Sequence, residues 1–136
     1  MEVRVEHVSG QQFEAVARGH RVVSDQPPEN GGTDAGMTPP ELLLASLGTC
    51  AGYYAAEYLK VRSLSLEGLT IHVSAEKALQ PPRLASFRIE VEAPSASDEK
   101  SRDGVLRAVK KCLIHNTMLH TPAFEIVVKA PEPAVV

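Results

Sequence analysis

The segment from Thr38 to residue 59 constrains the fold most, because it predicts a helix that is apolar on nearly every side. Thr38-Pro39-Pro40-Glu41 has the pattern of a helix start, with a capping threonine, proline at the first helical position and a glutamate three residues after the cap. A helix with so few polar residues is buried in the centre of a fold or against a partner molecule. We therefore expect a central helix over residues 39–59. Its apolar residues are Leu42, Leu43, Leu44, Leu47, Ala51, Ala55, Ala56 and Leu59.

Alternating apolar and polar residues on both sides of this helix predict β-strands. Two or three short antiparallel strands precede residue 24, and two more are expected at about residues 68–78 and 84–93, separated by Pro81-Pro82. A second helix is expected to begin at Ser97, and residues 124–129 predict a closing strand. The apolar face of the second helix is formed by Val105, Leu106, Val109, Cys112 and Leu113, which places Cys112 near its end. The pattern as a whole indicates an α+β fold.

Length and charge narrow the class of protein. A chain of 136 residues fits one domain, residues 1–136. The net charge of −3 gives no electrostatic basis for binding nucleic acid or anionic lipid. Neither a leader-like start nor an apolar run of membrane-spanning length is found, so we expect a cytoplasmic protein. The stretch from Asp25 to Thr38 is rich in proline and glycine and predicts a long loop, a feature that is usually functional or protective.

Cys50 and Cys112 are the two cysteines of the chain. In a reducing compartment a lasting structural disulfide is not expected, which leaves buried packing or redox chemistry. A pair that meets through folding can resolve an oxidised sulfur as a disulfide. The role of the two thiols therefore depends on whether the fold brings them together.

The residues around both cysteines resemble those of the OsmC/Ohr family of osmotically inducible and organic hydroperoxide resistance proteins, and in particular its broader OsmC-like branch. The order and spacing of the elements agree along almost the whole chain. The residues that carry the resemblance are Asp25-Gln26-Pro27, Gly31-Gly32, Gly36, the run from Thr38-Pro39-Pro40-Glu41 through Leu47-Gly48-Thr49-Cys50, and Lys111-Cys112-Leu113-Ile114-His115-Asn116-Thr117.

The resemblance implies an intertwined homodimer with curved antiparallel sheets wrapped around the helix that carries the first cysteine. It also implies thiol-dependent reduction of organic hydroperoxides, with Cys50 attacking the peroxide and Cys112 resolving as a disulfide. The expected partners are an organic hydroperoxide and an external dithiol reductant. No metal, flavin or haem cofactor is expected.

Two supporting residues are predicted. Cys50 lies about three turns into its helix, beyond the reach of the N-terminal dipole, so a thiolate there needs a cation from elsewhere. Arg21 is our candidate, ahead of Arg18, because it is closer in the chain to the glycine-rich loop. Glu41 is the candidate carboxylate, but it stands one residue later than in hydroperoxide resistance members, where the acid directly follows the proline. The intact Thr38-x-x-Glu41 pattern favours a capping role for it.

Several residues also have an ordinary interpretation. Free cysteines commonly just pack, and Tyr54 is as well explained by the core as by a pocket. Glu57 is on the same helix face as Cys50. His72, His115 and His120 have no spacing typical of a zinc site.

Three classes of function remain open at this point. The first is a thiol peroxidase that uses Cys50 and Cys112. The second is a non-catalytic protein that binds a lipid-like small molecule in an apolar cleft, with the cysteines as packing. The third is a redox sensor that signals by forming the disulfide.

Overall fold

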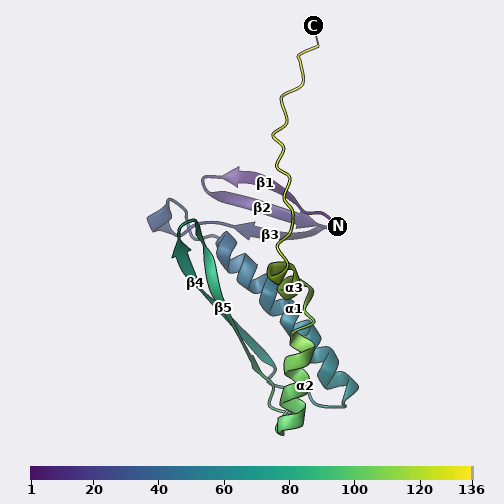
Figure 1. Ribbon diagram of the computed structural model, residues 1–136. Coiled ribbons are helices and arrows are strands. Elements are labelled where there is room, and N and C mark those ends of the chain that lie inside the picture. The colour runs from purple at the N-terminus through teal and green to yellow at the C-terminus, as the bar shows by residue number, and fades with distance from the viewer. Residues whose placement is uncertain (136) are drawn as a thin grey trace.

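The computed structural model of the protein describes residues 1–135 and has an α+β architecture with two separate antiparallel sheets and one long helix. Figure 1 shows a three-stranded sheet beyond the N-terminal end of the long helix and a two-stranded sheet beside it. The elements, in chain order, are β1 (Arg4–Ser9), β2 (Gln12–Ala17), β3 (His20–Ser24), η1 (Pro28–Asn30), α1 (Pro39–Val61), β4 (Thr70–Leu79), β5 (Pro82–Glu92), α2 (Glu99–Val109) and α3 (Leu113–Leu119).

The first sheet is an antiparallel meander in the order β1-β2-β3, as the alternation in the sequence predicts. Its turns contain Gly10 and Gly19, both with positive φ, a conformation that glycine adopts without steric cost. Every residue of β1 is exposed to solvent in the single chain. This sheet therefore buries little against the rest of its own chain.

The long loop after β3 is organised around one buried carboxylate. Asp25 is 1% exposed, and its two oxygens accept hydrogen bonds from the N–H groups of Gln26 (2.7 Å), Thr33 (3.2 Å) and Ala35 (2.9 Å) and from the Thr33 hydroxyl (2.9 Å). A side chain on Gly32 would overlap the carbonyl of Gln26, so the loop closes as tightly as its backbone permits. The loop is compact and fixes the entry into α1.

Helix α1 begins as the sequence predicts, with Thr38 as the N-cap, proline in the first turn and a complete capping box formed with Glu41. It continues to Val61, two residues beyond the expected end. Four of its residues, each four positions from the next, are buried: Leu47, Ala51, Ala55 and Leu59. They form one stripe along the helix, and most of its other apolar residues are only half-buried.

Strands β4 and β5 form an antiparallel hairpin that packs against α1, close to the predicted ranges. Pro82 begins β5, a position where a strand tolerates proline because no ladder hydrogen bond is lost within it. Gly48 and Gly52 of α1 lie against Val73 and Ile71 of β4. A Cβ on Gly48 would stand 3.0 Å from Val73, so the absence of a side chain there lets the helix approach the sheet closely, whereas a Cβ on Gly52 would meet Ile71 at an ordinary contact distance of 3.4 Å.

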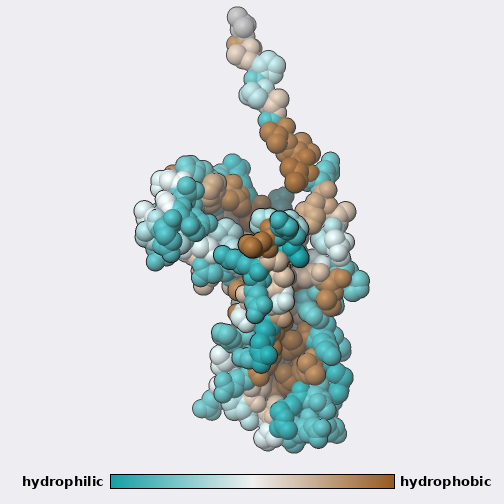
Figure 2. Space-filling model, turned by 60° about the vertical axis from the view of Figure 1, so that its left-hand side comes forward, coloured by the Kyte–Doolittle hydropathy of each residue, from teal (hydrophilic) through white to brown (hydrophobic). Residues whose placement is uncertain are grey.

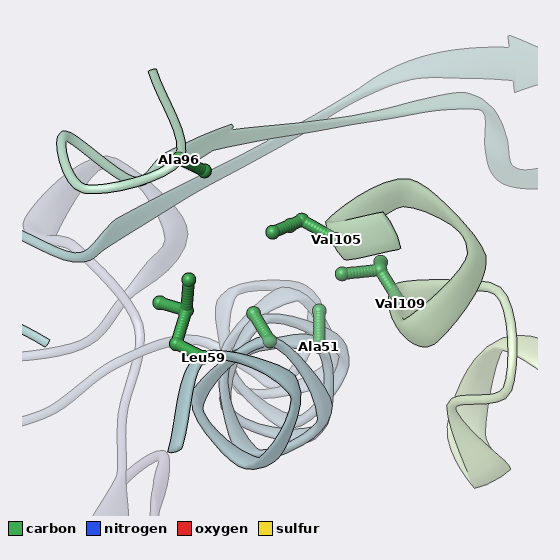
Figure 3. Close-up of a cluster of buried hydrophobic side chains, with 6 residues drawn as sticks. Ala51, Leu59, Ala96, Val105 and Val109 are labelled. Carbon is green, nitrogen blue, oxygen red and sulfur yellow. The ribbon is translucent and has the colours of Figure 1, made fainter. Parts of the chain in front are cut away.

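Helix α2 is capped by the Asp98 side chain, which accepts a hydrogen bond from the Ser101 N–H at 2.7 Å. It packs on α1 and completes the core, seen in Figure 3 as side chains from α1, from α2 and from the loop after β5 that converge. The buried members of this core are Ala51, Ala55, Leu59, Ala96, Val105 and Val109.

The prediction that Cys112 continues the second helix is wrong. Helix α2 ends at Val109, because the N–H groups of Lys111 and Cys112 turn back to the carbonyls of Ala108 and Val109 at 3.0 Å each, in the tighter i→i+3 pattern. Cys112 has non-helical dihedral angles and serves as the N-cap of α3. Leu113, expected on the buried face, is exposed.

The predicted closing strand at residues 124–129 is not formed either. The segment after α3 extends away from the body of the molecule (Figure 1). In Figure 2 the apolar part of this segment is the brown stretch between its tip and the body. Phe124 is 83% exposed and Ile126 is 88% exposed. A strand needs a neighbouring strand for its hydrogen bonds, and residues 1–135 of the single chain supply none at this place. Among the same residues no helix is both long and apolar enough to cross a lipid bilayer.

Candidate functional site

Cys50 lies about three turns into α1, on the same helix face as Leu43 and Leu47, which precede it by seven and three residues. It is half-buried and is a free thiol. Leu43 and Leu47 line a cavity of about 770 Å³. The helix therefore directs the Cys50 side chain toward the same side as an apolar space.

Cys112 occupies the joint between α2 and α3 and is fully buried. Its sulfur accepts a hydrogen bond from the backbone N–H of His115 at 3.4 Å, in the manner of an N-cap side chain. Its own N–H is bound to the Val109 carbonyl at 3.0 Å. The residue is thus held by one hydrogen bond to its side chain and one from its backbone N–H.

The fold brings the two cysteines together, since α1 contacts α3 and the two thiols influence each other. Burial raises the pKa of the Cys112 thiol, and the neighbouring Cys50 thiol raises it further, against a smaller lowering by the His115 N–H. A thiol with a raised pKa stays protonated at neutral pH and is a poor first nucleophile. This environment suits Cys112 for a second, resolving step better than for the initial attack.

The sequence did not predict the surroundings of His115, three residues after Cys112. Its Nδ1 is buried, and it has no hydrogen-bond partner among residues 1–135. The side chain lines the cavity of about 770 Å³ and also a second cavity of about 390 Å³ between β5 and α2. The spacing Cys112-x-x-His115 was the available signal, because residues three apart meet at a helix start.

The two cavities flanking His115 are mainly apolar. The smaller one has Arg102 and Lys110 among its lining residues, and the larger one has no charged side chain in its described lining. The larger cavity is lined by Leu43, Leu47, Leu84, Phe87, Ile89, His115, Thr117, Met118, Leu119, Pro122 and Phe124. Small apolar molecules fit such spaces better than highly polar ones.

The two predicted supporting residues, Arg21 and Glu41, have other partners in the structure. Arg21 is exposed and pairs with Glu14 on the neighbouring strand. The Glu41 carboxylate accepts hydrogen bonds from the Thr38 hydroxyl (2.7 Å) and N–H (3.1 Å), and these two contacts, the hydroxyl first, lower its pKa. Glu41 therefore acts as a helix cap in this chain.

Other residues singled out in the sequence have ordinary surroundings. Tyr54 packs edge-on against Tyr53, with ring centroids 5.3 Å apart, and Glu57 pairs with Lys60 at 3.2 Å. His72 is exposed and lies 3.8 Å from the Glu90 carboxylate. Within residues 1–135 there is no group of three or more histidine, cysteine, aspartate or glutamate side chains arranged to hold a metal ion.

Comparison with known proteins identifies relatives of this fold. The family model described as OsmC-like protein matches residues 31–127. No curated protein sequence matches the chain significantly. The chain is similar to solved structures at low sequence identity, and this likeness shows the shared fold.

Three such structures illustrate the range. A protein of Psychrobacter arcticus, named for osmotic stress induction and a detoxification response, is 19% identical, with 85% of each chain covered and a TM-score of 0.77. An OsmC-like protein of Mycoplasma pneumoniae is 18% identical, with 89% of each chain covered and a TM-score of 0.69. The organic hydroperoxide resistance protein OsmC of Legionella pneumophila is 17% identical, with 88% of this chain and 90% of that chain covered and a TM-score of 0.61.

Proposed function

Because the chain belongs to the OsmC-like protein family, we propose that it is a thiol-dependent peroxidase that reduces organic hydroperoxides, with Cys50 as the attacking residue and Cys112 as the resolving residue. The single observation that carries the proposal is that α1, with its half-buried Cys50, packs against α3, which starts at the fully buried Cys112, so that the two thiols are neighbours in the fold. The name of the Legionella pneumophila relative supports the choice of substrate.

The difference in burial supports the order of the two steps. Cys50 is the more accessible sulfur, so a peroxide meets it first. The Cys50 thiolate attacks the distal oxygen, the O–O bond breaks, and the products are a sulfenic acid and an alcohol. The Cys112 thiol then attacks the sulfenic sulfur, a disulfide forms, and the hydroxyl leaves as water. An external dithiol returns both sulfurs to the reduced state.

The apolar cavities support an alkyl or aryl hydroperoxide as the substrate. Leu43 and Leu47 line the larger cavity on the helix face that also carries Cys50. An apolar substituent gains free energy on leaving water for such a space, whereas hydrogen peroxide has no such group. The need to keep both thiols reduced between turnovers favours the cytoplasm as the site of action.

We also propose that the functional form is a homodimer and that the chain acts as one OsmC-like domain. The exposed apolar segment around Phe124 and Ile126 is too large to remain in water, and a partner subunit is the natural cover for it. The same assembly supplies the cation that Cys50 lacks in its own chain. Arg21, 64% exposed on β3, is our candidate for reaching the partner's thiol.

The test is a pair of single substitutions. Cys50→Ser abolishes dithiol-dependent consumption of cumene hydroperoxide, because the attacking sulfur is gone. Cys112→Ser permits one oxidation and then accumulates sulfenic or sulfinic acid at Cys50, because the resolving sulfur is gone. Mass spectrometry of the peroxide-treated proteins distinguishes the two, with Ser46→Ala as a control that changes α1 but no thiol. If Cys50 carries no more sulfenic or sulfinic acid in Cys112→Ser than in wild type, the assignment of Cys50 as the attacking and Cys112 as the resolving residue is wrong.

The cavities also favour a second candidate, a non-catalytic protein that binds a small lipid-like molecule. Apolar spaces of about 390 and 770 Å³ are of the size that holds such ligands. This candidate predicts wild-type protein that is inert to every hydroperoxide and that retains ligand affinity in Cys50→Ser. The peroxide experiment above therefore separates the two.

A further inference from the structure

The buried Nδ1 of His115 is a feature that the proposed reaction has not yet used. Buried polar atoms are hydrogen-bonded in the great majority of proteins, and an exception at a reactive site calls for a functional reason. This atom has no partner among residues 1–135. The backbone N–H of the same residue is bound to the Cys112 sulfur at 3.4 Å, so the residue that carries the imidazole is attached directly to that thiol.

The capping box of α1 provides an internal template for where a side chain at this position reaches. There, Thr38 is the N-cap and Glu41 stands three residues later, and the Glu41 carboxylate lies 2.7 Å from the Thr38 hydroxyl and 3.1 Å from its N–H. Cys112 and His115 hold the corresponding positions at α3. The Cys112 N–H is already bound to the Val109 carbonyl at 3.0 Å, so the thiol is the remaining donor of the cap residue, and its hydrogen bond to Nδ1 is not formed in the resting structure.

The surroundings of His115 contain no competing base. Arg102 and Lys110 of α2 line the smaller cavity with it, and the larger cavity has no other titratable group in its described lining. From α1, Cys50 is the titratable group that acts on the Cys112 thiol. None of the lining residues of either cavity is a carboxylate. Burial keeps the Cys112 thiol protonated, whereas the thiolate is the form that attacks.

We propose that Nδ1 of His115 accepts the proton of the Cys112 thiol as Cys112 closes the disulfide with Cys50, and so acts as the general base of the resolving step. This role rests on the proposed function for its oxidant, the Cys50 sulfenic acid. The S–S bond forms, the S–O bond breaks, the Cys112 sulfur is oxidised and the Cys50 sulfur is reduced. The proton held at Nδ1 passes to the departing hydroxide, which leaves as water. Nδ1 accepts it in the tautomer that carries hydrogen on Nε2.

The test isolates this step from peroxide chemistry. One equivalent of 5,5′-dithiobis(2-nitrobenzoate) converts the more accessible Cys50 to an aryl mixed disulfide and releases one thionitrobenzoate. Attack by Cys112 on the Cys50 sulfur then releases the second, in a phase whose rate does not depend on reagent concentration. That second rate measures how readily Cys112 loses its proton and attacks.

His115→Asn is expected to slow the second phase by about 100-fold, the usual contribution of a general base, and to leave the first phase unchanged. The matched control is His120→Asn, which removes an exposed histidine from the other end of α3 and is expected to stay within about twofold of wild type. His115→Ala is the second variant. It opens space beside both cavities. Added imidazole is expected to raise the rate of its second phase at least about tenfold.

The pH profile separates a base from a packing residue. The rate of disulfide closure in wild type is expected to stop rising with pH once Nδ1 is available as a base, whereas in His115→Asn it continues to rise with hydroxide, since Arg102 and Lys110 are present in both proteins. The proposal is overturned by a His115→Asn rate within about threefold of wild type, by a His115→Ala defect that imidazole does not relieve, or by wild-type protein in which the second phase never occurs. Histidine-dependent closure in a chain inert to hydroperoxides overturns the proposed substrate and leaves the role of His115 intact.

Discussion

At the scale of single residues, the site depends on side chains held by backbone N–H groups of their own segments. The Cys112 sulfur accepts from the His115 N–H at 3.4 Å, and the Asp25 carboxylate accepts from three backbone N–H groups and one hydroxyl. Such bonds fix a side chain without a long-range partner. They allow a small fold to position a thiol and a loop with few buried polar residues.

Asp25→Asn is expected to destabilise the protein. The hydrogen bond from Ala35, followed by those from Gln26 and Thr33, lowers the pKa of Asp25 from 3.8 to about 2, and an amide directs two N–H donors at groups that are themselves donors. We expect the melting temperature at neutral pH to fall by about 5–10 °C. The control is Asp34→Asn, an exposed residue of the same loop with positive φ, which asparagine tolerates.

The same carboxylate predicts a dependence of stability on pH. Because its folded pKa is depressed, its contribution is fully present above pH 3.8 and is lost as the pH falls toward about 2. The difference in melting temperature between wild type and Asp25→Asn should therefore shrink over that interval. A difference that stays constant down to pH 2 contradicts the assignment.

At this scale, the sequence predicts contacts between neighbours in the chain better than contacts between distant segments. Thr38 and Glu41 form the capping box that their spacing indicates, because the contact is local. The burial of Asp25 and the unpartnered Nδ1 of His115 depend on how distant segments pack. Local patterns in a single sequence do not predict such packing. Whether Arg21 and Glu41 assist Cys50 stays a prediction.

At the scale of elements, glycines govern how closely the helices approach their neighbours. A side chain on Gly104 of α2 would overlap the ring of Tyr58 on α1, whereas one on Gly52 of α1 would meet Ile71 at an ordinary contact distance of 3.4 Å. The two glycines are therefore not equivalent, although both lie within helices. One permits a close helix crossing, and the other has room to spare.

We expect Gly104→Ala to destabilise the protein by about 1–3 kcal/mol, because the Tyr58 ring must then leave its place at the crossing of α1 and α2. Gly52→Ala is the matched control and is expected to be neutral or to stabilise by up to about 1 kcal/mol through helix propensity. Urea denaturation measures both. A Gly104→Ala protein as stable as wild type rules out the close crossing, and the double variant with Tyr58→Ala should recover part of the loss.

The error at the end of α2 also belongs to this scale. Val105, Val109 and Cys112 continue a helical spacing, and the sequence pattern alone favours one uninterrupted helix. Two i→i+3 hydrogen bonds close α2 at Val109 instead. Helix ends of this kind carry no strong sequence signal when neither glycine nor proline marks them.

At the scale of the whole molecule, the chain exposes the apolar segment that the sequence predicted as a closing strand. The α+β fold class is confirmed by the architecture and by its likeness to OsmC structures, while the intertwined dimer stays a prediction. The alternation around Ile126 does predict a strand, but its partner is absent from the described residues of one chain.

Ile126→Asp is expected to shift a micromolar dimer to monomer and to raise the dissociation constant at least about 100-fold, because a charge would enter an apolar interface. In the single chain Ile126 is 88% exposed, so a monomeric protein would tolerate the change almost freely. Glu125→Gln is the control in the same segment. Sedimentation velocity checks both, and a stable wild-type monomer counts against the dimer and against Arg21 acting across it.

The exposed first sheet has a consequence for how the protein reaches its working form. Strands β1 to β3 bury little in their own chain, so their order in a dimer would be acquired when two copies meet. Refolding would then be faster at higher protein concentration. Subunits would exchange between dimers only as fast as a dimer dissociates.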